Sequence, residues 1–271
     1  MYREREYGFP AGAECVDFTG LGGTSCYCDE AAREQILRFL DSARNDTCHF
    51  DRGESACHFE RGESACHFDR AKRVEKSLNF IDSGDYHYVS ALMLEGIREP
   101  FSLVLLDNHP DMQSPAFGGD ILSCGGWVRW ALERMPMLQR VIIIGIDPEL
   151  AGETEGFGDR LTVLPREEKD SGKEQLAALK TWLEASQEPV YLSVDKDVLA
   201  PEFASTDWSQ GTMTLDTLLE ICGTVAGSGR LLGTDVCGEL TAAKGGAEKD
   251  FIKNSDVNNK IYQNLFLYLK D

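Results

Sequence analysis

Short apolar runs recur along the chain, and runs such as VIIIGI are apolar at every position rather than at alternate positions. Continuous apolar runs are typical of strands in a parallel sheet, because helices cover both faces of such a sheet. The runs predict seven strands, at residues 14–18, 79–82, 102–107, 140–146, 161–164, 190–195 and 231–235.

Amphipathic segments lie between these runs and predict helices. Their apolar faces are formed by Leu176, Leu179 and Leu183, by Leu215, Leu218, Leu219 and Cys222, and by Ile261, Leu265 and Tyr268. Thr214 is placed to cap the second helix, and the last helix is expected to begin at Ser255. The alternation predicts one α/β domain over residues 1–271, with three layers and a mainly parallel central sheet between helices. Ligands bind beyond the carboxyl ends of the strands in such sheets.

A nine-residue tandem repeat interrupts the pattern. The sequence CHFDRGESA begins at Cys48, CHFERGESA begins at Cys57, and CHFDR begins at Cys66. Cys-His pairs suggest zinc, but a spacing of nine residues does not match the short spacings that bring ligands onto one ion. We therefore predict a surface insertion at about residues 48–76, which costs little stability because loop closure depends weakly on length. Outside the repeat, the histidines are His87 and His109.

The charge of the chain restricts its partners. It has 46 acidic and 27 basic residues, for a formal net charge of -19. This charge repels nucleic acid and anionic membranes, so a neutral or cationic small molecule is the better partner. The sequence shows neither a signal-peptide pattern nor about 18 consecutive apolar residues. Its nine cysteines are scattered, which argues against a secreted disulfide framework, and we expect a cytoplasmic protein.

Two predicted strands end in acids. The run FSLVLL continues into DNHPD, where Asp107, His109 and Asp111 alternate and point to one side of an extended chain. The run YLSV continues into Asp195 and Asp197, which alternate in the same way. Carboxylates combined with imidazole suit Mn, Fe, Co or Zn, whereas oxygen donors alone would suggest Mg or Ca. A polar turn after a strand explains either motif alone, but two in one parallel sheet favour a metal site.

A third strand end supplies the other histidine. In FIDSGDYHY, a strand and a glycine turn precede a helix that is expected to begin near His87. A lone histidine is more often a core or capping residue than a ligand. This one is expected at the same end of the sheet as the two acidic motifs, so it joins the candidate site.

The three motifs together resemble the ureohydrolase superfamily, which includes arginases, agmatinases and formimidoylglutamases. They are His87, Asp107-x-His109-x-Asp111, and Ser193-x-Asp195-x-Asp197. The resemblance implies an arginase/deacetylase-like fold and a homo-oligomer. It also implies two Mn²⁺ ions, one held by His87, Asp107, Asp111 and Asp195 and the other by Asp107, His109, Asp195 and Asp197. A water activated between the ions would attack a guanidinium or amidine carbon, and Asp111 would orient it.

Three positions around this core differ from the family pattern. Cys124 stands where many arginases and agmatinases have a histidine that is thought to shuttle protons, which makes it a candidate proton carrier or nucleophile, although free cysteines are often inert. Glu239 is the candidate to face the substrate's guanidinium, but the family places that acid one residue earlier, at Gly238. A capping or solvated role explains Glu239 equally well. Gln113 corresponds to a residue that fixes the amino-acid end of the substrate in arginases.

Three functions remain open from the sequence. The first is a Mn-dependent hydrolase that cleaves a C–N bond of a guanidino or amidine compound. The second is a deacetylase-like amide hydrolase, although such enzymes use a histidine pair as acid and base, and that pair is missing here. The third is a metal-binding family member without turnover, which the absence of the shuttle histidine keeps open.

Overall fold

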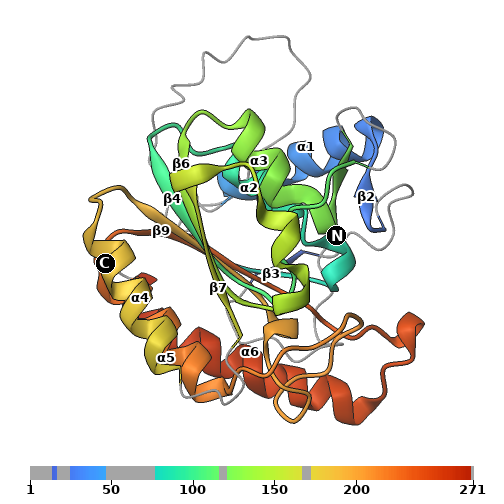
Figure 1. The fold of residues 1–271 in the computed structure, drawn as a ribbon. Coiled ribbons are helices and arrows are strands. Elements are labelled where there is room, and N and C mark those ends of the chain that lie inside the picture. The colour runs from blue at the N-terminus through green and yellow to red at the C-terminus, as the bar shows by residue number, and fades with distance from the viewer. Residues whose placement is uncertain (1–13, 17–24, 47–76, 116–120, 167–171, 270–271) are drawn as a thin grey trace, which may run out of the picture.

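The computed structural model describes residues 14–16, 25–46, 77–115, 121–166 and 172–269. These residues form a central sheet with helices on both faces, which confirms the predicted three-layer α/β fold (Figure 1). The tandem repeat lies outside the described residues, so the surface insertion at about 48–76 and the single-domain boundaries stay predictions.

All seven predicted strands are present, and their ends differ from the predicted ones by at most two residues. They are β1 (Glu14–Val16), β3 (Leu78–Ile81), β4 (Phe101–Leu106), β6 (Leu138–Ile146), β7 (Leu161–Pro165), β8 (Val190–Asp195) and β9 (Leu231–Cys237). Their order in the sheet is β1-β3-β9-β8-β4-β6-β7, and each neighbouring pair is parallel. Two further short strands, β2 (Tyr27–Cys28) and β5 (Leu122–Ser123), pair antiparallel and were not predicted.

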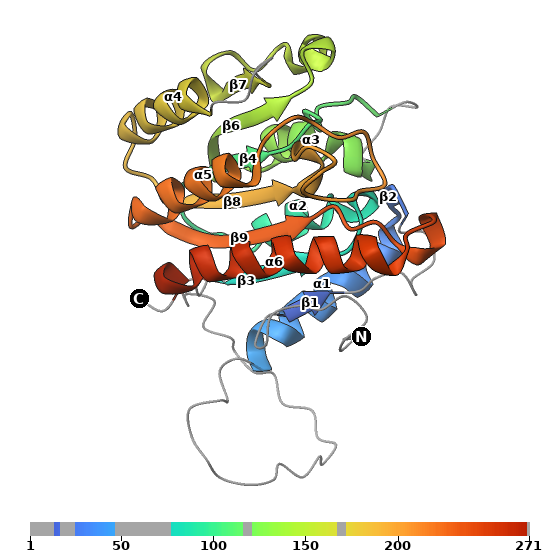
Figure 2. The same ribbon diagram turned by 90° about the horizontal axis from the view of Figure 1, so that it is seen from below.

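The helices divide between the two faces of the sheet (Figures 1 and 2). One face carries α1 (Glu30–Asp46), α2 (Val89–Leu94) and α3 (Trp127–Arg134), and the other carries α4 (Lys173–Glu184), α5 (Leu215–Gly227) and α6 (Glu248–Leu269).

The strand β4 shows why a continuously apolar run suits this position. Its Leu103 and Leu105 belong to the core under α1 to α3, whereas Val104 and Leu106 belong to the core under α4 to α6. Alternate side chains of one strand therefore fill two separate cores. None of the helices among the described residues is both long enough and apolar enough to cross a membrane.

Of the two helix starts predicted from the sequence, the structure confirms one and contradicts the other. Thr214 caps α5 as predicted, because its hydroxyl oxygen accepts a hydrogen bond from the Thr217 amide at 3.2 Å. The predicted start of the last helix at Ser255 is wrong, since α6 begins at Glu248. The early part of α6 buries Asn254 and Asn258, so its inward face is polar and gives no apolar signal.

Candidate metal centre

Three strands in the middle of the sheet, β3, β8 and β4, lead to the candidate ligands. His87 lies between the 3-10 helix η2 (Gly84–Tyr86), which follows β3, and α2. Asp107 follows β4, and Asp195 is the last residue of β8. Because these strands are parallel, their carboxyl ends meet at one edge of the sheet, where ligands bind in this class of fold.

The His87 imidazole lies at the centre of three carboxylates. Its Nδ1 is 3.0 Å from Asp111 Oδ2, 3.2 Å from Asp107 Oδ2 and 3.5 Å from Asp195 Oδ2. All four side chains are buried. The structure thus brings together the four residues that the resemblance assigned to one metal ion.

His109 forms the second part of the cluster. Its Nδ1 is 2.8 Å from Asp197 Oδ2 and 3.6 Å from Asp107 Oδ1. The atoms of His87, Asp107 and Asp111 are close enough together to hold one ion, and those of Asp107, His109 and Asp197 are close enough to hold another. Asp107 belongs to both groups, as a bridging ligand must.

The cluster carries more negative charge than its own residues compensate. Burial, and then the charges of Asp197 and Asp107, raise the pKa of Asp195. Burial and the charge of Asp107 likewise raise the pKa of Asp197. Asp107 Oδ2 is buried, and the His87 nitrogen that it contacts is shared with Asp111 and Asp195. Buried carboxylates require a cation, and divalent Mn, Fe, Co or Zn fits this set of imidazole nitrogens and carboxylate oxygens.

The imidazoles respond to the same charge. Burial alone would lower the pKa of His109, but hydrogen bonds to Asp107 and Asp197 raise it to about 11. The pKa of His87 is also raised well above its ordinary value, because hydrogen bonds to Asp107 and Asp111 outweigh the effect of burial. Both histidines thus act as the available positive charge in the absence of a metal.

A chain of hydrogen bonds orients His87 through Nε2, the ring nitrogen that does not face the carboxylates. Its Nε2 lies 3.0 Å from Ser193 Oγ, and the Ser193 hydroxyl donates to Asp235 Oδ1 at 2.7 Å. The Ser90 hydroxyl donates to the same oxygen at 3.0 Å. Because the Ser193 proton is directed at Asp235, His87 donates from Nε2, so release of the Nδ1 proton to make room for a cation would leave the Nδ1 lone pair facing the cluster. Partners of this kind fix the tautomer of metal-binding histidines.

Trp127 positions Asp111 and was not recognised in the sequence. Its indole Nε1 donates to Asp111 Oδ2 at 2.6 Å, and its ring centroid is 5.0 Å from that of His87. Asp111 has a φ of 51°, in the left-handed region that non-glycine residues rarely adopt. Its carbonyl accepts from the Val128 amide at 3.1 Å, near the start of α3. Side-chain and backbone contacts therefore hold this strained residue in place.

The outer side of the cluster also has contacts that the sequence did not reveal. The backbone N–H of Asn108 donates to Asp197 Oδ1 at 3.0 Å, and Ser209 Oγ lies 2.8 Å from His109 Nε2. The Trp208 ring packs against the His109 ring at 5.8 Å between centroids, with an edge-on orientation. Trp208 is 41% exposed, so its ring forms a solvent-facing wall beside His109.

Glu239, predicted to face the substrate's guanidinium, is engaged inside the protein instead. Lys196 Nζ and Asn258 Nδ2 donate to its Oε1, and Asn254 Nδ2 donates to its Oε2 at 2.8 Å. The side chain is only 2% exposed. Glu239 therefore anchors the segment after β9 to α6, and its carboxylate is not free to receive a guanidinium.

Cys124 lies near the cluster but is not in a reactive state. Its side chain is buried, and its amide donates to the Cys26 carbonyl at 3.0 Å. Burial, followed by the charge of Asp111, raises the pKa of the Cys124 thiol, so the thiol is protonated at neutral pH. A nucleophilic cysteine needs the thiolate. The role of proton carrier stays a prediction.

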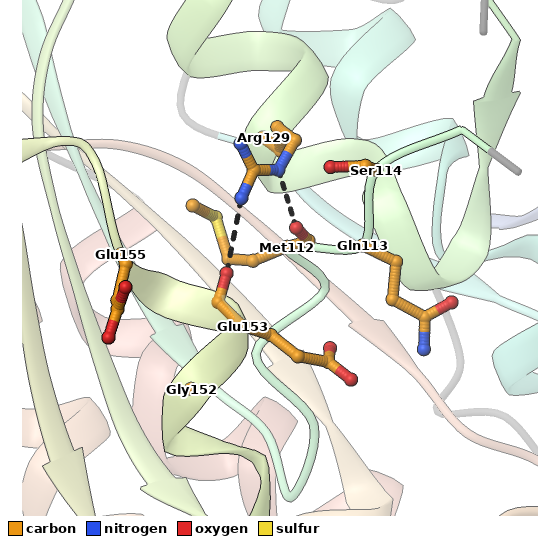
Figure 3. Close-up of a pocket in the computed structure, with 7 residues that line it drawn as sticks. All are labelled: Met112, Gln113, Ser114, Arg129, Gly152, Glu153 and Glu155. Atoms are coloured by element: carbon orange, nitrogen blue, oxygen red, sulfur yellow. Dashed lines mark hydrogen bonds between the residues drawn. The ribbon is translucent and has the colours of Figure 1, made fainter.

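Gln113 lines an open pocket of about 440 Å³ that adjoins the Asp111 segment (Figure 3). The remaining lining residues are Met112, Ser114, Arg129, Gly152, Glu153 and Glu155. Arg129 donates to the carbonyl oxygens of Met112 and Glu153, at 2.6 and 3.2 Å, and so joins the Met112 segment to the 3-10 helix η4 (Pro148–Thr154) across the pocket. The side chain of Gln113 extends away from Arg129. The contact of Gln113 with the amino-acid end of a substrate stays a prediction.

Comparison with known proteins agrees with this geometry. Residues 74–242, more than half of the chain, match the sequence model of the Arginase family. The chain belongs to the Arginase family. An uncharacterized protein of Thermotoga maritima is 30% identical to it over 162 residues, which cover 60% of this chain and 58% of that protein.

Several solved structures share the fold. Proclavaminate amidino hydrolase from Streptomyces clavuligerus is 23% identical, with a TM-score of 0.55, over 71% of this chain and 63% of that chain. Formiminoglutamase from Trypanosoma cruzi, solved with Mn²⁺, is 15% identical, with a TM-score of 0.56, over 71% of this chain and 66% of that one. The present chain thus spans less than two thirds of the length of the Thermotoga and Streptomyces proteins.

Proposed function

We propose that this arginase-family protein is a binuclear-metal hydrolase that cleaves a C–N bond of a guanidino or amidine compound. The observation that carries the proposal is the cluster of four buried carboxylates, the buried His87 and the half-buried His109 at the carboxyl ends of the strands, where negative charge exceeds what the residues compensate. The amidino hydrolase among the structural neighbours supports the substrate class. The Mn²⁺ bound to the formiminoglutamase supports manganese as the ion.

The cluster residues divide into two overlapping ligand sets. The first would comprise His87, Asp107, Asp111 and Asp195, whose ligand atoms lie around His87 Nδ1. The second would comprise Asp107, His109 and Asp197, together with Asp195 as the second bridging ligand that the family resemblance implies. Two divalent ions bound there would supply Lewis-acid activation of water and stabilise the negative charge that develops during attack on the carbon. The fixed orientation of His87 and Asp111 means that the ligands require little rearrangement on binding.

The residues of the chain also supply a place for proton transfer. The carboxylate of Asp111 lies 3.0 Å from His87 Nδ1 and accepts the indole N–H of Trp127, so it is held beside the other ligand atoms, within reach of a water at the centre. Asp111 would accept a proton from the attacking water, and the departing amine nitrogen would take up a proton when the C–N bond breaks. Trp127 would hold the carboxylate in place through both steps.

A cationic substrate fits the surroundings of the cluster. The net charge of -19 attracts cations, and the exposed Trp208 presents an aromatic wall beside His109. Planar cations bind favourably near aromatic rings, and the interaction contributes about 0.5–1 kcal/mol at exposed sites. Because Glu239 is engaged with Lys196, recognition of the guanidinium would depend on the cluster and this wall.

A substrate panel tests the proposal. Guanidino acids, guanidino amines, formimino amino acids and acetylated amines would be incubated with the Mn²⁺-loaded protein, and release of urea, ammonia, formamide or acetate would be measured. We expect product from a guanidino or amidine compound and none from Asp195→Asn. Asp216→Asn, an exposed acid in the first turn of α5, should retain full activity as the matched control.

The second candidate function is a metal-binding protein without turnover. It is favoured by Cys124 and Gly238 at two positions where the family pattern has a histidine and an acid. Two bound ions with no product from any member of the panel would overturn the hydrolase for these substrates and support this alternative. Release of acetate alone would support the deacetylase-like amide hydrolase.

A further inference from the structure

A buried cysteine lies beside the cluster and has no part in the ligand sets described above. Cys237 is the last residue of β9 and is completely buried. Its Sγ is 3.2 Å from Asp195 Oδ2. One atom each from His87, Asp195 and Cys237 lie within 4.8 Å of one another, which is close enough to hold a metal ion.

The register of two central strands puts the thiol in this place. Ser193 lies opposite Asp235, and Asp195 lies opposite Cys237, in the parallel pair of β8 and β9. Side chains alternate along each strand, so these four residues share one face of the sheet. The Ser193–Asp235 pair orients His87 from that face. The Asp195–Cys237 pair, two residues further along both strands, reaches the cluster itself.

The residue after Cys237 keeps the chain close to Asp195. Gly238 has a φ of 92°, and a Cβ at this position would lie 2.3 Å from Asp195 Oδ1. Only glycine permits both the left-handed backbone and this approach. The position where the family pattern has an acid is thus closed to any side chain, and the side chain nearest to the ligands is the thiol one residue earlier.

We propose that Cys237 is a metal ligand, whose thiolate joins His87 and Asp195 at one of the two metal positions. The inference rests on the binuclear centre of the proposed function and adds a sulfur donor to it. In the metal-free protein the thiol donates its proton to Asp195. When a dication binds, the S–H bond breaks, the sulfur lone pair forms the bond to the metal, and the proton passes to solvent.

Another buried cysteine shows what a purely structural thiol looks like in this protein. Cys222 on α5 is also completely buried, but it belongs to the apolar core under α4 to α6. Burial alone raises the pKa of its thiol. Buried cysteines of this kind behave as small apolar residues. Cys237 differs because a carboxylate and an imidazole of the cluster surround its sulfur, and Cys222 is therefore its matched control.

A sulfur donor changes which ions the centre prefers. Thiolates bind Zn²⁺, Fe²⁺ and Co²⁺ more strongly than Mn²⁺, which favours oxygen and nitrogen ligands. The position that contains Cys237 should therefore select a softer ion than the position formed by Asp107, His109 and Asp197. With limiting mixed metals, we expect Zn²⁺ or Co²⁺ to fill the Cys237 position first and Mn²⁺ to remain in the other.

Cobalt titration tests the inference through absorption rather than activity. The assay uses the full chain with Cys48, Cys57 and Cys66 changed to Ser, because the repeat carries further Cys-His pairs. Loading with Co²⁺ should produce a near-ultraviolet thiolate-to-cobalt charge-transfer band. We expect Cys237→Ser to lose this band and Cys222→Ser to keep it. Elemental analysis of the same samples gives the number of ions bound.

X-ray absorption tests the same bond without the Cys237 substitution. The zinc-loaded protein with the repeat cysteines replaced should show sulfur at about 2.3 Å from zinc. Two bound ions without sulfur ligation would overturn the role of Cys237 and leave the metal centre intact. A sulfur signal that persists in Cys237→Ser would assign the donor to another cysteine and overturn it as well. No bound ion at all would overturn both the inference and the metal centre of the proposed function.

Discussion

Two groups of buried charges meet at the end of β8, and they differ in how their charge is compensated. Asp195 and Asp197 face the ligand cluster, whereas Lys196 between them points toward α6. Lys196 Nζ binds Glu239 and the side-chain oxygen of Asn258, so this ion pair is complete within the protein. In the cluster, Asp107 Oδ2 contacts His87 Nδ1 at 3.2 Å, but Asp111 and Asp195 approach the same nitrogen, so one imidazole faces three carboxylates.

The difference separates a structural role from a ligand role. Burial and charge type do not distinguish the two groups, since Glu239 and Asp195 are both acidic and nearly inaccessible. A buried charge is tolerated when a partner in the protein pairs with it, and otherwise it requires an ion from outside. The Lys196–Glu239 pair therefore joins the sheet to α6, whereas the cluster is the part that we propose to bind divalent cations.

The largest expected effect comes from a change on the cluster side. Asp195→Ala removes a carboxylate that the proposal assigns to both ions, so bound metal should fall from about two ions per chain to one or none, with loss of turnover. Elemental analysis of the purified protein measures this, with Asp216→Ala as the exposed control. Unchanged metal content would show that Asp195 is not a ligand. The proposed difference between Asp195, which binds metal, and Lys196, which pairs with Glu239, would then be wrong.

The next effect concerns the complete ion pair. Glu239→Gln leaves the buried charge of Lys196 without its counter-charge and should lower the free energy of unfolding by about 3–5 kcal/mol. Urea denaturation measures the loss, and the double variant Lys196→Met/Glu239→Leu should recover much of it. The folded fraction of Glu239→Gln should bind as much metal as the wild type. If Glu239→Gln instead lost metal or substrate binding while its stability was unchanged, Glu239 would be a residue of the functional site and not a structural one.

A third prediction tests how strongly the cluster is oriented by its surroundings. Trp127→Phe keeps an aromatic ring but removes the hydrogen bond to Asp111, and metal affinity should fall about 10–100-fold. Competition with a chelator measures the affinity. Trp182→Phe, on the opposite face of the sheet, is the matched control and should leave the affinity unchanged. An equal loss in both variants would indicate a general effect of packing.

The smallest effect is a pH dependence of the metal-free protein. The pKa values of Asp195, Asp197, His87 and His109 are all raised in the folded state, so the folded cluster binds protons more tightly than the unfolded chain. The stability that these protons contribute is present at low pH and is lost as the pH rises. Between about pH 5 and pH 8, we expect a decrease on the order of 1 kcal/mol or more.

Thermal denaturation after EDTA treatment measures this decrease, and added metal should abolish most of it. A flat profile without metal would show that the cluster compensates its own charge, as the Lys196–Glu239 pair does. That result would remove the physical argument for a cation at this edge of the sheet.

The sequence determined the strands and the ligand motifs, because both depend on neighbours along the chain. A strand apolar on both faces is visible as an apolar run, and alternation alone puts Asp107 and His109, or Asp195 and Asp197, on one side of an extended segment. The resemblance carried by these motifs indicated the Arginase family, and the match over residues 74–242 shows it.

The tertiary structure decided what depends on contacts between distant segments. The start of α6 was mispredicted because a buried polar face gives no apolar periodicity. Trp127 reaches Asp111 only once α3 is packed on the sheet, and the register of β8 against β9 puts Cys237 opposite Asp195. The left-handed turn at Gly238 leads Glu239 toward Lys196. Residue type and spacing do not encode which side chains meet, because strand register and packing set those distances.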